Sequence, residues 1–173
     1  MLRKKLQKMT EVEDVSRHPS LLAALTRESL NTVAILNSPH VIRRYTCLMH
    51  VFAFAEKEEY AAIAMRDGGR IFAASAFAHW LIDNGLLEEI SQAEAQRSDL
   101  VFYFGADGRF KHAGLIAGDG RVISKWGVGH LYEHGLFEVP DSYGTEVRFF
   151  RALPYRVAYG YFRRFAEDNG IKV

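Results

Sequence analysis

The residues best suited to chemistry are a single cysteine and seven histidines. Cys47 directly follows Thr46, whose hydroxyl is a preferred cap for the first amides of a helix, so we expect Cys47 to open a helix. A thiol in that position feels the positive end of the helix dipole, which favours the nucleophilic thiolate. A free cysteine on an apolar helix is more often a small buried hydrophobic residue, so its position leaves both roles open.

A thiol nucleophile needs a base, and several histidines are candidates. His112 opens an apolar segment, HAGLIA, that is typical of a strand. His50 lies three residues after Cys47 on the same helical face, so it is an alternative base or a polar wall of the site. His130 and His134 have the spacing of two zinc ligands on a helix, but the acidic partner of a zinc motif is lacking and nearby glycines disfavour a helix. We therefore expect neither a metal nor a cofactor.

The elements that would position these residues fall into two groups along the chain. Apolar spacings of three and four residues predict helices first, around 21–25, 30–36, 46–55, 56–65 and 72–83. Aromatic and β-branched residues then predict strands at about 100–104, 111–117, 121–126 and 146–151, followed by a closing helix after Pro154. Helices followed by an antiparallel sheet predict an α+β fold rather than an alternating α/β fold.

The order of these features resembles the NlpC-type branch of the papain-like cysteine peptidases over roughly residues 45–126. In that family the nucleophile opens a helix, a strand reading like GDLVFF follows, and the base lies in a strand reading like HVGIYLGDG. The counterparts here are Thr46-Cys47, the segment SDLVFYF and the segment HAGLIAGDG. The resemblance implies a papain-like fold, with a nucleophile helix packed on an antiparallel sheet, Cys47 as nucleophile and His112 as general base.

The third polar residue of that family, which orients the imidazole, lies twelve positions after the histidine and corresponds to Ser124. A two-residue turn in this hairpin would put Lys125 on the face that carries His112, whereas a three-residue loop, 118–120, would put Ser124 there. Because a lysine would oppose the imidazolium that forms during catalysis, we favour Ser124 as the orienting residue.

The segment that begins at Ser124 resembles a second group of proteins, which share a Ser-Lys-aromatic-Gly sequence, a later histidine and a Tyr-Gly pair. That resemblance implies no activity. We expect the corresponding residues of this chain to form one unit, either structural or lining the pocket. Four residues are the candidates for substrate binding: Lys125, Trp126, His134 and His50.

Composition places few demands on partners. The net charge is +1, from 22 basic and 21 acidic residues, so basic clusters near the two ends are expected to be a solvated tail and a solvated helix face, with no nucleic acid bound. No apolar segment is long enough for a membrane span, and no apolar region of a signal peptide follows the basic start. A single cysteine allows no internal disulfide. We therefore expect a cytoplasmic protein.

Together these features predict one domain over residues 1–173. It would consist of a helical cover over 1–40, a nucleophile helix and hairpin core over 45–126, and a final strand and closing helix over 127–173. The expected activity is cysteine-dependent hydrolysis of an amide or peptide bond, through a thioacyl intermediate, on a peptide-like or acyl substrate. The alternatives are a thiol acyltransferase and a catalytically inactive binding module on the same fold.

Overall fold

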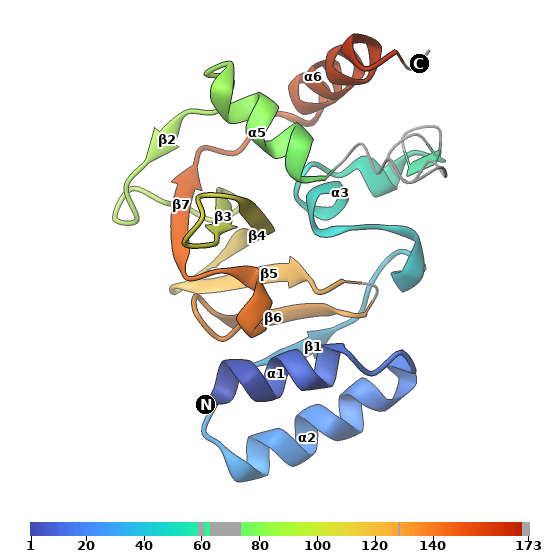
Figure 1. Ribbon diagram of the computed structural model, residues 1–173, viewed down its shortest axis with the longest axis vertical. Helices are drawn as coiled ribbons and strands as arrows, with labels where there is room; N and C mark the ends of the chain where they lie inside the picture. Colours follow the sequence, from blue (N-terminus) through green and yellow to red (C-terminus); the bar gives the residue numbers. More distant parts are fainter. Residues whose placement is uncertain (59–60, 63–73, 128, 171–173) are drawn as a thin grey trace.

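The computed structural model describes residues 1–58, 61–62, 74–127 and 129–170, and its central feature is an antiparallel sheet (Figure 1). The described strands lie in the spatial order β1-β6-β5-β4-β3-β7-β2, and each pairs antiparallel with its neighbours. The strands are β1 (Ala34–Leu36), β2 (Glu89–Ile90), β3 (Leu100–Phe104), β4 (Phe110–Gly118), β5 (Arg121–Lys125), β6 (Leu131–Gly135) and β7 (Glu146–Phe150). Helices combined with an antiparallel sheet confirm the predicted α+β class.

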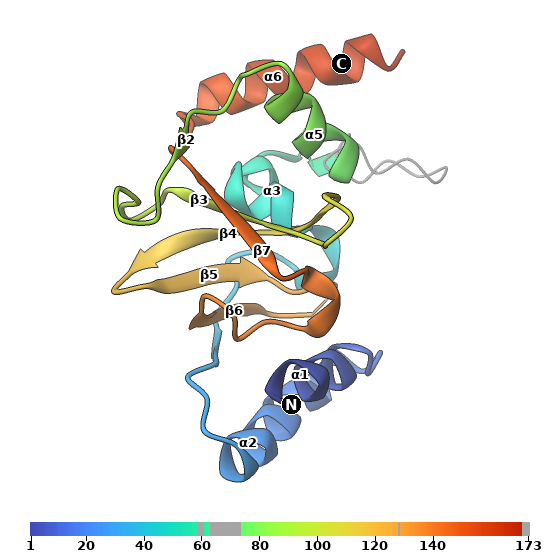
Figure 2. The same cartoon turned by 60° about the vertical axis from the view of Figure 1, so that its left-hand side comes forward.

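Helices pack on both sides of this sheet, so it has two separate hydrophobic cores (Figures 1 and 2). On one side lie α1 (Leu2–Thr10) and α2 (His18–Glu28), and on the other lie α3 (Cys47–Val51), α5 (Ser75–Asp83) and α6 (Tyr155–Asp168). In the central strand β3, Phe102 belongs to the core under α3 and Tyr103 to the core under α1. All five residues of β3 are buried as a result. The sheet is therefore a rigid platform. Truncating the buried Phe102 to alanine would lower the free energy of unfolding by about 3–5 kcal/mol.

The hairpin between β4 and β5 differs from both turn geometries considered for the sequence. Asp119-Gly120 forms a two-residue turn, since both residues have positive φ and Gly118 pairs with Arg121. A register shift then follows, and Ile116 pairs with Val122. A β-bulge therefore moves the pairing by one residue immediately after the turn.

The bulge decides which side chains of β5 share a face with His112. Because Ile116 lies opposite Val122, alternation along the two strands puts His112 and Ser124 on the same face. Lys125 points to the opposite face. The expected placement of Ser124 is confirmed, although it results from a bulge rather than from a three-residue loop.

Two predictions for the first forty residues are wrong. The segment 30–36, predicted as a helix, contains β1, which pairs with β6; its β-branched residues Thr32, Val33 and Ile35 favour a strand. The first ten residues, predicted as a solvated tail, form α1. Leu6 of this helix is fully buried, and Lys5 forms an ion pair with a glutamate of α2, with 2.9 Å between nitrogen and oxygen.

Other predictions agree with the structure in kind but not in extent. The helices predicted around 21–25 and 72–83 correspond to α2 and α5, and the closing helix corresponds to α6. The segment between the strands predicted at 121–126 and 146–151, for which the sequence predicts no regular element, contains β6. Half of the helix predicted over 56–65 lies outside the described residues. Within the part of the chain that is described, no helix has the length and apolar character needed to cross a membrane.

Candidate active site

Cys47 opens α3, as the sequence predicts. The preceding Thr46 is extended, and its hydroxyl accepts a hydrogen bond from the Met49 N–H at 3.3 Å. The helix has only five residues, and the burial of Leu48, Met49 and Val51 against the sheet holds it in place. Cys47 itself is partly buried at the start of this packed helix.

The surroundings of the Cys47 sulfur act on its pKa in opposite directions. Burial raises the pKa of the thiol above its usual value of 9.0, and this is the larger effect. The backbone N–H groups of Ala113, Leu48 and Cys47 face the sulfur and lower the pKa, as does the Lys125 ammonium. The expected thiolate, with a lowered pKa, is therefore wrong for the resting protein. A helix of five residues has too weak a dipole to outweigh desolvation, and Cys47 is a thiol at neutral pH.

His112 lies in β4, next to the residue whose N–H faces the sulfur. A bulge leaves Lys111 unpaired, because Phe104 pairs with Phe110 while Tyr103 pairs with His112. The bulge turns the imidazole away from the phenylalanine core. His112 is 2% exposed, and its Nε2 atom is buried without a hydrogen-bond partner.

The His112 ring is held by stacking instead of by a hydrogen bond. The ring of Tyr143 lies against it, with ring centroids 4.0 Å apart and 21° between the planes. Burial lowers the pKa of His112 well below 6.5, and the neighbouring His134, His50 and Lys125 lower it further. The imidazole is therefore neutral at pH 7 and able to accept a proton.

Cys47 packs into the core under α3, where α3 lies against β4 and β5, whereas the register of β4 puts His112 on the Tyr103 side of the sheet. The N–H of Ala113 links the two residues in space, because it faces the Cys47 sulfur and directly follows His112 in the chain. The His112 Nε2 atom has no hydrogen-bond partner among the described residues, so it does not accept a hydrogen bond from the thiol. The structure thus places the thiol beside the backbone of the residue that follows His112, and the pairing of the thiol with the imidazole stays a prediction.

Lys125 approaches the same thiol from the other face of β5. It is fully buried, its Nζ donates to the Gly127 carbonyl at 2.7 Å, and it lies 4.9 Å from the centroid of the Tyr45 ring. Burial lowers the pKa of Lys125 to about 8, and the Cys47 thiolate acts to raise it. Lys125 is therefore a neighbour of the candidate nucleophile and not a residue of the protein surface.

Ser124 shares the face of His112 but bonds elsewhere. Its Oγ receives a hydrogen bond from Trp126 Nε1 at 2.9 Å and lies 2.7 Å from His134 Nε2. His134 Nδ1 lies 2.8 Å from the Gly135 carbonyl, which accepts a hydrogen bond from the Nδ1–H and leaves Nε2 to accept one from the Ser124 hydroxyl. The side-chain donors and acceptors in this hydrogen-bonded series, from Trp126 through Ser124 to His134, are paired with one another. Nothing in the geometry supports Ser124 as the residue that orients His112.

Trp126 and His134 form part of the sheet interior. Trp126 is 1% exposed and stacks on Tyr132 with ring centroids 4.1 Å apart, and His134 has no exposed surface. Burial lowers the pKa of His134 to about 4, so the ring is neutral. The Ser-Lys-Trp-Gly segment and His134 do form one unit, as expected. Of its members, Lys125 is the one beside Cys47.

His50 faces the same region from α3, one turn after Cys47. Its Nε2 atom is buried without a hydrogen-bond partner, and its ring lies 6.4 Å from that of Tyr45, between centroids. Burial lowers the pKa of His50 to about 4, with a further contribution from Lys125. Its orphaned nitrogen makes His50 the alternative base that the sequence suggested.

Two residues of this cluster were not singled out from the sequence, Tyr143 and Tyr45. Tyr143 ends a 3-10 helix, Asp141–Tyr143, and its hydroxyl bonds to the backbone of Gly127. It is followed by Gly144, which has a φ of 94° and lies so close to the Phe104 carbonyl that a Cβ would be 2.2 Å from the oxygen. The Tyr-Gly pair noted in the sequence was the available signal for Tyr143. Tyr45 carried no such signal.

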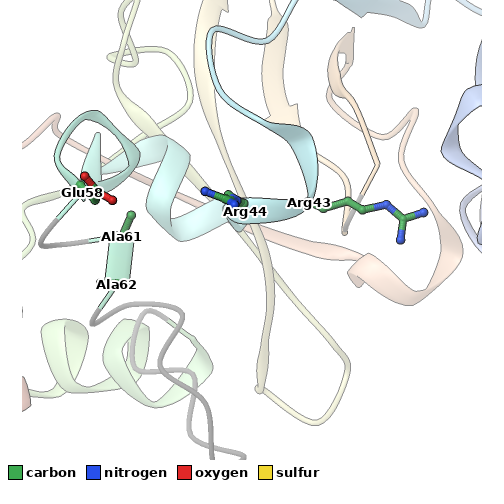
Figure 3. Close-up of a pocket in the computed structure, with 5 residues that line it drawn as sticks. All are labelled: Arg43, Arg44, Glu58, Ala61 and Ala62. Carbon is green, nitrogen blue, oxygen red and sulfur yellow. The ribbon is translucent and has the colours of Figure 1, made fainter.

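A cavity of about 260 Å³ is lined by residues that shortly precede and follow α3 in the chain (Figure 3). Its lining residues are Arg43, Arg44, Glu58, Ala61 and Ala62. Figure 3 shows the Arg43 side chain directed away from Arg44, and its guanidinium donates to the Glu13 carbonyl at 2.9 Å. Neither the thiol nor an imidazole lines this cavity, so it is not the reaction centre.

The histidines considered as zinc ligands serve other purposes. His130 Nε2 bonds to the Val15 carbonyl at 2.9 Å, while His134 bonds within the sheet. In the described ranges, no group of three or more histidine, cysteine or acidic residues is arranged to hold a metal ion.

Comparison with known proteins adds no further constraint. The chain matches no protein-family model, no curated protein and no solved structure. The class that its own residues define is an α+β protein with a thiol, two orphaned imidazole nitrogens and a buried ammonium gathered beside one end of a central sheet.

Proposed function

We propose that this protein is a cysteine hydrolase, in which Cys47 attacks an amide or related acyl carbon and His112 is the general base. The observation that carries the proposal is the contact between the Ala113 N–H and the Cys47 sulfur, which puts the thiol beside the residue that follows His112. The sequence resemblance to NlpC-type papain-like peptidases supports the same pair. The substrate class is an amide, peptide or other acyl compound.

The protonation states fit a general-base mechanism. His112 is neutral and Cys47 is a thiol at pH 7, so the imidazole takes the thiol proton as the sulfur attacks the acyl carbon. A carbon–sulfur bond forms, and the carbonyl electrons move to oxygen. As the oxyanion collapses, the carbon–nitrogen bond breaks and the imidazolium gives its proton to the leaving amine. His112 then deprotonates a water that attacks the thioester, and the sulfur leaves and regains the proton.

An orphaned imidazole nitrogen also favours a working site over an inert one. A buried donor or acceptor without a partner costs about 1–3 kcal/mol, and both His112 and His50 carry one. A purely structural histidine is normally paired, as His134 is. Unpaired nitrogens beside a thiol are expected where a reacting group must be received.

The fate of an acyl group on Cys47 distinguishes a hydrolase from an acyltransferase and from an inactive binding module. The native protein is mixed with p-nitrophenyl acetate, and the mass of the intact chain is followed with and without glycylglycine. Because Cys47 is the only cysteine, Cys47→Ala is the matched control. A hydrolase forms an acetyl adduct that water removes, and an acyltransferase passes the acetyl group to the dipeptide amine. Native protein that gains no adduct on Cys47, but does so once unfolded, would show the inactive binding module.

A further inference from the structure

Lys125 is a buried cation, and no anion among the described residues balances it. The residue has no exposed surface, and no described carboxylate forms an ion pair with it. Its only direct partners in the described chain are the Gly127 carbonyl and the face of the Tyr45 ring. An unpaired buried charge costs several kcal/mol, so its retention points to an anion that is present at some stage of function.

The groups around the ammonium identify that anion. The helix α3, which Cys47 opens, packs against β5, and Tyr45, two residues before Cys47, has its ring centroid 4.9 Å from the ammonium nitrogen. The charges of three further groups couple to that of Lys125, namely those of Cys47, His50 and His112. Two of these are histidines whose positive forms the ammonium disfavours. Tyr45 is a phenol whose pKa burial raises. The thiol of Cys47 is the one neighbour that the ammonium helps to ionise.

We propose that Lys125 is a positioning residue for the reaction, whose ammonium stabilises the Cys47 thiolate as it forms. The inference rests on the proposed function and deepens it by naming the cation of the site. His112 receives the proton and Lys125 balances the negative charge left on sulfur. No bond to Lys125 forms or breaks. The role differs from the substrate binding that the sequence suggested for Lys125.

The Gly127 carbonyl and the Tyr45 ring explain how the ammonium is held in place. The hydrogen bond of 2.7 Å fixes one N–H of Nζ, and the ring face accepts the charge without neutralising it. Gly127 has a φ of 50°, a conformation that glycine adopts at little cost. The Ser-Lys-Trp-Gly segment therefore holds the ammonium at a fixed point beside the sulfur.

The test is the rate of Cys47 alkylation by iodoacetamide as a function of pH, in the wild type, Lys125→Met and Lys111→Met. Iodoacetamide is neutral, so a substrate carboxylate has no part in the result. Lys125→Met keeps the length of a buried side chain without its charge, and Lys111→Met removes a partly exposed lysine of β4 as the matched control. We expect alkylation at pH 7 to slow at least tenfold in Lys125→Met and to be unchanged in Lys111→Met. Superimposable profiles for the wild type and folded Lys125→Met would overturn the proposal.

A second measurement leaves Lys125 in place and does not depend on the folding of Lys125→Met. Coupling between two charges is reciprocal, so the titration of Lys125, followed by NMR of ¹³C-labelled lysine, should lie at higher pH in Cys47→Asp, whose carboxylate stands in for the thiolate, than in Cys47→Ala. An unchanged titration would contradict the inference. If Cys47 is acylated in a His112-dependent way while both lysine tests fail, the inference is wrong and the proposed function stands. If native Cys47 reacts with neither probe, both are wrong.

Discussion

The Tyr143 ring lies almost parallel to the His112 imidazole, with 4.0 Å between ring centroids, and no hydrogen bond to that imidazole is found in the described chain. Stacking fixes the plane of the ring but not its protonation. The Tyr143 hydroxyl bonds to the backbone of Gly127, whose carbonyl holds Lys125. One short segment thus connects the candidate base with the ammonium beside the nucleophile.

The stacking can be separated from the hydroxyl with two variants of Tyr143. Tyr143→Phe keeps the ring, so we expect acylation of Cys47 within about twofold of the wild type. Tyr143→Leu removes the stack and should slow acylation roughly tenfold, because a misplaced base loses proton-transfer efficiency. It should also cost about 1–3 kcal/mol of stability, measured by urea unfolding. Equal rates in the two variants would mean that the stack does not position His112.

Ser124→Ala tests whether this hydroxyl serves the fold or the chemistry. The change leaves Trp126 Nε1 and His134 Nε2 without their shared partner in a buried place. We expect a loss of about 1–3 kcal/mol in the free energy of unfolding for each group left unpaired. The acylation rate of the folded protein should be nearly unchanged. Ser20→Ala, at an exposed position of α2, is the control. A folded Ser124→Ala protein that cannot be acylated would show that Ser124 takes part in the reaction.

Acid should destabilise the protein through His134. Its pKa is about 4 in the folded state and 6.5 when unperturbed, so between these values the unfolded chain binds more protons. Stability is therefore full above pH 6.5 and falls as the pH decreases towards 4, by about 3 kcal/mol for this one group. Urea unfolding at pH 7 and pH 4.5 measures the loss, which His134→Gln should reduce. Equal stability of the wild type at both pH values would show that His134 is not held neutral.

The predictable part of the fold was the part that local pattern controls. The strand rich in aromatic residues, the Gly-Asp-Gly hairpin and the capped start of α3 were all visible in the sequence. β1 was mistaken for a helix because Ala34–Leu36 is short, and its pairing partner β6 lies about one hundred positions away in the chain. The two β-bulges, between β3 and β4 and between β4 and β5, could not be predicted from the sequence either. Each depends on the match between two strands and not on any one residue.

For the candidate site too, local pattern predicts some features and tertiary packing decides the others. Spacing and resemblance predict Cys47 and His112, and the structure places the Cys47 sulfur beside the N–H of Ala113, the residue after His112. The pKa of Cys47 was expected to be lowered, because a helix start is visible in sequence whereas the desolvation that outweighs it is not. Ser124 was assigned by counting twelve positions, which says nothing of the partners that Trp126 and His134 supply. The Tyr-Gly pair marks Tyr143 in the sequence, but its stacking on His112 depends on tertiary packing.

The central claim is that His112 is the base for Cys47, and the acylation rate with p-nitrophenyl acetate between pH 6.5 and 8 tests it most directly. In this window a thiol and a neutral imidazole are both present, since the pKa of Cys47 lies above 9.0 and that of His112 below 6.5. The wild-type rate should therefore be nearly level. His112→Gln leaves only the thiolate to react, so its rate should be about 100-fold lower at pH 7 and rise tenfold per pH unit. His50→Gln should resemble the wild type. A His112→Gln profile that superimposes on the wild-type profile, or a level profile lost only in His50→Gln, would contradict the account.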